Sequence, residues 1–161
     1  MDQLTKIRQA YIGTMAMTAR TLGHLLAPVS QEQATTLRDG PEGWTTVEVV
    51  CHLRDFDGFF RGRAEMILAE ETPNLPAYDH EAIAIEREYN DQQLTEAYDA
   101  LLKSREATQA LFANLTPEQW ERAGIHPESG YFTLTDAARQ VGLHDLVHIE
   151  QTLKILTGRT A

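Results

Sequence analysis

The chain has 161 residues, of which 42% are hydrophobic and 24% charged. These values are typical of a soluble globular domain, and the length is too short for two separate cores. We therefore expect residues 1–161 to form one domain. Fourteen Lys and Arg against 24 Asp and Glu give a formal net charge of −10, which argues against nucleic acids and anionic membrane surfaces as partners.

The cysteine content and the first residues of the chain argue against secreted and membrane-spanning proteins. Cys51 is the only cysteine, so an intramolecular disulfide is excluded. The first residues lack the basic start and apolar run of a signal peptide. No apolar stretch approaches the ~18 residues that a spanning helix needs. The sequence thus predicts a cytoplasmic protein that does not enter a membrane.

Four long segments carry apolar residues at helical spacing. The first covers residues 4–26, and the second covers 44–71, where Thr45 and Glu48 have the spacing of a capping box. The third covers residues 92–115. The fourth covers 133–156, with Thr133 as a capping residue and Gly158 as the terminator.

The connections between these segments are unequal. Residues 72–91 are long for a bundle connection and are expected to hold a helical turn near 81–86. Such a crossover would let the second and third helices run parallel. Residues 117–122 are predicted to form a short helix, followed by an irregular loop, and strand-like alternation appears only over a few residues. The sequence predicts an all-α fold, a four-helix bundle with long crossover connections.

Two histidines occupy the inward stripe of the fourth predicted helix. His144 and His148 are four residues apart, which places both imidazoles on one helix face. On the second predicted helix, His52 lies at the edge of the apolar stripe and can also face the bundle interior. Three imidazoles from two facing helices bind Zn²⁺, Ni²⁺ or a similar ion and leave a position open. Buried histidines bonded to a carbonyl or carboxylate are the alternative.

Several other polar residues are candidates for roles around such a centre. Glu48 and Asp55 share the His52 side of their helix, and Asp145 follows His144. Each carboxylate could orient an imidazole, accept a proton or simply be solvated. His126 lies just before the fourth helix and could line the mouth of the site. His80, in the long connection, is expected to be solvated.

Three blocks of sequence carry a family resemblance. They are Trp44-Thr45 with Glu48 and His52-Leu53-Arg54-Asp55, then Trp120 to Pro127, then His144-Asp145-Leu146-Val147-His148-Ile149-Glu150-Gln151. Together they resemble the DinB-like (DinB/YfiT) superfamily over nearly the whole chain. The resemblance implies a four-helix bundle with long second and third connections, often a homodimer, and a divalent metal on His52, His144 and His148. Some members of the superfamily use the metal with a low-molecular-weight thiol.

Two functional interpretations follow. In the first, the protein is a metal-dependent enzyme, a thiol S-transferase or hydrolase, because a three-histidine metal with an open position activates a water or a thiol. In the second, it is a non-catalytic module that binds metal or a small molecule, for example in a stress response. A fourth protein ligand, such as Glu48 or Asp55, would favour the second interpretation because structural sites are closed.

Overall fold

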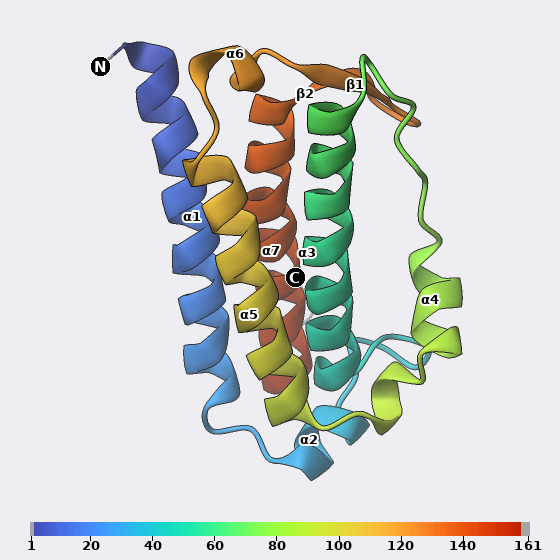
Figure 1. Ribbon diagram of the computed structural model, residues 1–161. Helices are drawn as coiled ribbons and strands as arrows, with labels where there is room; N and C mark the ends of the chain where they lie inside the picture. The colour runs from blue at the N-terminus through green and yellow to red at the C-terminus, as the bar shows by residue number, and fades with distance from the viewer. Residues whose placement is uncertain (1, 159–161) are drawn as a thin grey trace.

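The computed structural model describes residues 2–158 and shows four long helices standing side by side (Figure 1). The four are α1 (Gln3–Leu26), α3 (Thr46–Ala69), α5 (Leu94–Ala113) and α7 (Leu134–Thr157). The predicted four-helix bundle is therefore confirmed. Among the described residues, no helix is long and apolar enough to cross a membrane.

Local sequence signals set the ends of two helices that matter for the site. The Thr45 side chain accepts a hydrogen bond from the Glu48 N–H, and the Glu48 carboxylate accepts one from the Thr45 N–H. Thr133 and Asp136 form the same reciprocal capping box at the start of α7. Gly158 ends that helix with a φ of +64°, a conformation that glycine adopts without a steric penalty.

The helix directions are unusual for a simple bundle, because α3 and α5 run the same way, as do α1 and α7 (Figure 1). Contacts between α3 and α5 pair Asp57 with Ser104 and Arg61 with Thr108, a constant difference of 47 residues. In the α1–α7 contacts Arg8–Thr135 and Thr18–Asp145, the residue numbers also differ by a constant 127. A constant difference means that the two helices of each pair run in the same direction. The prediction that the second and third long helices are parallel is confirmed.

Each connection contains short elements. The first holds α2 (Gln31–Thr36), and the long crossover from α3 to α5 holds α4 (His80–Glu86) and the 3₁₀ turn η1 (Tyr89–Asp91). The expected helical turn near 81–86 is thus present. In the third connection, α6 (Pro117–Trp120) is followed by two antiparallel strands, β1 (Ala123–His126) and β2 (Gly130–Thr133).

The hairpin corrects the expectation of an irregular loop after residue 122. Each strand has only four residues, which is too short for a recognisable alternation. Part of its support also comes from far along the chain. The Ile125 N–H donates to the Pro73 carbonyl at 2.8 Å, and the Leu75 N–H donates to the Ile125 carbonyl at 2.9 Å.

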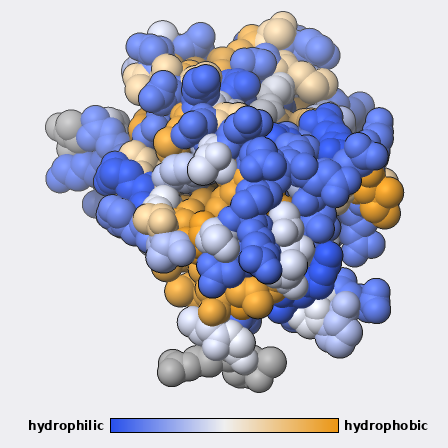
Figure 2. Space-filling view, turned by 90° about the horizontal axis from the view of Figure 1, so that it is seen from below, coloured by the Kyte–Doolittle hydropathy of each residue, from blue (hydrophilic) through white to orange (hydrophobic). Residues whose placement is uncertain are grey.

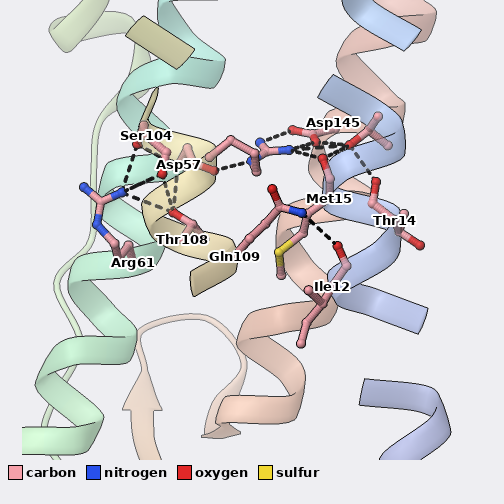
Figure 3. Close-up of polar contacts among 11 residues, drawn as sticks. Ile12, Thr14, Met15, Asp57, Arg61, Ser104, Thr108, Gln109 and Asp145 are labelled. Carbon is pink, nitrogen blue, oxygen red and sulfur yellow. Dashed lines mark hydrogen bonds and ion pairs between the residues drawn. The ribbon is translucent and has the colours of Figure 1, made fainter. Parts of the chain in front are cut away.

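A buried polar layer divides the apolar core into two clusters. One cluster includes Leu22, Leu53 and Leu101, and the other includes Met15, Phe60 and Phe112. The layer between them contains Thr18, Asp57, Arg105, Thr108 and Asp145, all buried, and so takes residues from all four long helices (Figure 3). It places a charged network at the mid-height of the bundle.

Candidate metal centre

Three histidines from two antiparallel helices converge on one point. His52 on α3 faces His144 and His148 on α7, and the Nε2 atoms of His52 and His144 are 3.0 Å apart. One ligand nitrogen from each of the three imidazoles lies within 4.8 Å of the others. Ligands of a tetrahedral Zn²⁺ at ~2.0 Å are separated by about 3.3 Å, so the spacing suits a first-row divalent ion.

Burial keeps the imidazoles neutral. The pKa of His52 is lowered to about 2 and that of His144 to about 3, chiefly by burial and then by repulsion from neighbouring histidines. The pKa of His148 is lowered by burial as well. A neutral imidazole offers a lone pair, which is the form that binds a metal. His52 Nδ1 is buried and finds no hydrogen-bond partner among the described residues, and the nitrogen that faces His144 is Nε2.

Gln151 fixes the orientation of one imidazole. The Nδ1–H of His148 donates to Gln151 Oε1 at 2.7 Å, and Gln151 Nε2 donates to Asp39 Oδ2 at 2.6 Å. With the proton on Nδ1, the Nε2 lone pair of His148 is free to bind a metal. Gln151 was not among the predicted site residues, although its position three residues after His148 on the same helix is a usable signal.

The structure does not bring Glu48 or Asp55 to the three histidines. Glu48 serves in the capping box of α3 and lies 3.3 Å from Arg38. Asp55 accepts hydrogen bonds from Arg54, Arg87 and Tyr89. Burial alone would raise the pKa of Asp55, but the hydrogen bonds and the charge of Arg54 outweigh it and lower the pKa. Both carboxylates already have partners.

Asp145 lies next to the histidines in sequence but points into the buried polar layer (Figure 3). Its two oxygens accept hydrogen bonds from Arg105, and one of them also accepts from the Thr18 hydroxyl. The negative charge of Asp145 opposes the effect of burial on the pKa of His148. Asp145 therefore influences the site through its charge and through the placement of α7.

A cavity of about 210 Å³ opens beside His144. Its walls include Phe56, Tyr78, His80, His126, Gln140 and His144. His126 thus lines the same cavity as His144. His80 is exposed, but its ring centroid is 6.1 Å from that of His52, and its charge contributes to the lowered pKa of His52 and His144. The sequence does not reveal this proximity, because it depends on the path of the crossover.

A DinB superfamily profile matches residues 15–152, most of the chain and all three histidines. The chain belongs to the DinB superfamily. The protein named "Putative metal-dependent hydrolase YfiT" from Bacillus subtilis is 33% identical over 119 residues, 71% of this chain and 64% of that protein. A protein of the same description from Oceanobacillus iheyensis is 29% identical over 143 residues, 84% of this chain and 79% of its own.

Solved structures show the same fold. The Bacillus subtilis YfiT structure, described as having an unusual four-helix bundle topology, superposes with a TM-score of 0.85 at 24% identity, over 95% of this chain and 89% of that one. A mycothiol-dependent maleylpyruvate isomerase superposes with a TM-score of 0.76 at 10% identity, over 94% of this chain and 63% of that one. The chain thus shares the four-helix bundle fold of these two proteins.

Proposed function

We propose that this DinB superfamily protein is a metal-dependent enzyme that acts on a small molecule, with His52, His144 and His148 as the ligands of a divalent ion. The observation that carries the proposal is the convergence of three neutral imidazoles beside a cavity. The names of the Bacillus and Oceanobacillus relatives support metal dependence. Zn²⁺ and Ni²⁺ are the ions that three imidazoles favour among those commonly available.

An open coordination position supports an enzyme over a closed structural site. Among residues 2–158, the group of potential ligands contains the three histidines and no carboxylate. A divalent ion held there would lower the pKa of a water or of a low-molecular-weight thiol toward neutrality. The chain's own residues orient His148 through Gln151 and exclude bulk water with the aromatic side chains around His52 and His144. Hydrolysis and thiol transfer are the two reactions we propose.

Elemental analysis of the untagged protein tests the metal site. We expect close to one divalent ion per chain in the wild type and loss of that ion in His52→Ala, His144→Ala and His148→Ala. His24→Ala, which removes an exposed histidine at the end of α1, is the matched control and should retain the metal. A wild-type protein that contains no metal and takes up neither Zn²⁺ nor Ni²⁺ would refute the proposal.

Activity assays then separate enzyme from binding module. The metal-loaded protein is tested with chromogenic esters and amides, and with a panel of low-molecular-weight thiols and a model electrophile. Turnover that disappears with the metal supports the enzyme. A metal-loaded protein without any turnover favours the alternative, a non-catalytic module that binds metal or a small molecule.

We also propose that the protein forms a homodimer through α7. Four apolar residues on that helix are 41–63% exposed: Leu143, Leu146, Val147 and Leu153. Monomeric proteins rarely expose an apolar row of this kind, whereas a dimer interface would bury it. Figure 2, which views the molecule from below, shows hydrophobic residues (orange) gathered at the centre and lower left of that face. Light scattering should give twice the chain mass, and Val147→Asp should give the monomer. The cytoplasmic location expected from the sequence stays a prediction.

A further inference from the structure

The cavity beside His144 contains a buried arginine without a carboxylate partner. Arg63 on α3 is 6% exposed, and its Nε and Nη2 donate to the Pro76 carbonyl at 3.1 and 2.5 Å. Its guanidinium lies 5.0 Å from the centroid of the Tyr78 ring. No carboxylate in residues 2–158 forms an ion pair with it, and Glu128, which also lines the cavity, is exposed. A buried charge of this kind is costly unless an opposite charge joins it.

His126 adds a second unmatched donor at the same place. Its Nδ1 accepts hydrogen bonds from the backbone N–H groups of Glu128 and Ser129 at 3.2 and 3.3 Å. A neutral imidazole has one accepting nitrogen, so Nε2 carries the proton. That Nε2–H faces Arg63 Nη1, another donor, at 3.0 Å. An oxygen with negative charge, accepting from both groups, would resolve this conflict.

The rest of the cavity indicates what else the ligand contains. Phe56, Phe60 and Tyr78 provide aromatic walls. Gln140, one turn before His144 on α7, lines the cavity with an Oε1 that is buried and has no partner among the described residues. A cavity of ~150 Å³ is large enough to hold benzene, so about 210 Å³ has room for one ring and a small polar group.

We propose that this cavity receives a small carboxylic acid with an aromatic or apolar body, whose carboxylate is held by Arg63 and His126 next to the three histidines. The inference names the substrate class of the site in the proposed function and rests on it for the chemistry. The binding itself depends only on the chain's own residues. A donor group on the ligand, such as a hydroxyl, would satisfy Gln140.

Binding of acids and matching amides to the metal-free protein tests the proposal. Benzoate and phenylacetate are titrated into protein dialysed against a chelator, alongside benzamide and phenylacetamide, and binding is followed by ligand-detected NMR. We expect both acids to bind and the amides to bind at least tenfold more weakly. Removing the metal first excludes direct ligation of the carboxylate by an ion. Amides that bind as well as the acids, or acids that do not bind at all, would overturn the proposal.

A pair of arginine variants then locates the site. Arg63→Gln should weaken the binding of benzoate at least tenfold. Arg122→Gln is the matched control, since Arg122 also donates to main-chain carbonyls, those of Ile67 and Glu70, but does not line the cavity. If Arg63→Gln fails to fold, His126→Phe replaces it, with the same expectation. Unchanged affinity in a folded Arg63→Gln would refute the assignment.

Metal content, measured on each variant as purified and before the chelator dialysis, separates this inference from the proposed function. Arg63→Gln should retain the metal and lose the acid, whereas His148→Ala should lose the metal and still bind benzoate. A wild-type protein that binds benzoate but no metal would support the carboxylate site and refute the metal-dependent function. A wild-type protein that binds the metal but not benzoate would refute the carboxylate site alone.

Discussion

Arg105 on α5 donates two hydrogen bonds to Asp145 on α7, from Nη1 at 2.5 Å and from Nη2 at 3.0 Å, one residue along the chain from His144. Its Nε donates to Asp57 on α3 at 2.5 Å. The three side chains are almost fully buried. Arg105 Nη1 also donates to the Met15 carbonyl of α1 at 2.9 Å, so one guanidinium ties together all four long helices at the height of the histidines.

Removal of this arginine should be strongly destabilising. Arg105→Met leaves two buried carboxylates without their main partner, so we expect the free energy of unfolding to fall by about 3–5 kcal/mol. Urea denaturation measures the change. Arg139→Met is the control, because the Arg139–Asp136 pair is exposed and should contribute less than about 1 kcal/mol. Equal losses in the two variants would show that the buried layer adds no special stability.

The metal-free protein should lose stability as the pH falls below about 6.5. The pKa of His52 is lowered from 6.5 to about 2 and that of His144 to about 3, so in acid the unfolded chain binds more protons than the folded one. The free energy of unfolding is therefore highest above pH 6.5. It decreases toward pH 3 by up to about 1.4 kcal/mol per pH unit for each histidine.

Urea titrations at about pH 7.5, 6.5 and 5.5 measure this slope in a range where carboxylates with a pKa near 4 scarcely titrate. His144→Gln removes one of the depressed groups and should flatten the slope. His24→Gln, at an exposed position, should not change it. A slope that is the same in all three proteins would contradict the burial of neutral imidazoles.

Gln151→Ala should weaken metal binding without abolishing it. The substitution removes the acceptor for the His148 Nδ1–H, so the imidazole can turn and change tautomer, and such changes lower metal affinity about 10–100-fold. Gln151→Glu keeps an acceptor at this place and should restore most of the affinity. Competition with a chromogenic Zn²⁺ chelator provides the dissociation constants. Gln109→Ala, on α5, is the control and should leave them unchanged.

Cys51 should be inert in the folded protein. The side chain is fully buried, and burial raises its pKa to about 11, so almost no thiolate is present at neutral pH. We expect no reaction with an aromatic disulfide reagent until urea unfolds the chain, when one thiol per chain should appear. Rapid labelling of the native protein would instead make Cys51 a candidate nucleophile.

The long helices were predictable because their signals are local. Apolar periodicity located all four, and the capping residues Thr45 and Thr133 marked two of their beginnings. The hairpin at residues 123–133 was not predictable in this way, since its first strand also bonds to Pro73 and Leu75, some fifty residues earlier. Helix spacing alone indicated that His144 and His148 share a face, and the structure brings His52 to them.

The carboxylates show what spacing cannot supply. Glu48, Asp55 and Asp145 lie close to the histidines in sequence, but each is paired with arginine. Glu48 pairs with Arg38, Asp55 with Arg54 and Arg87, and Asp145 with Arg105. A carboxylate orients toward the nearest compensating charge, and a sequence does not reveal which one that is. The role of Arg63 was not predictable for the same reason, because its partners Pro76 and His126 come from the crossover and the hairpin.

The parallel direction of α3 and α5 requires a crossover that returns along the full length of the bundle (Figure 1). That crossover and the hairpin supply Tyr78, His80 and His126 to the cavity, whereas the three histidines of the triad belong to the long helices. The crossover and the hairpin thus form one side of the cavity, whereas Arg63, Gln140 and the three histidines come from α3 and α7. A mutant library confined to residues 76–80 and 127–129 would therefore change the shape of the cavity wall while keeping Arg63, His126 and the three histidines.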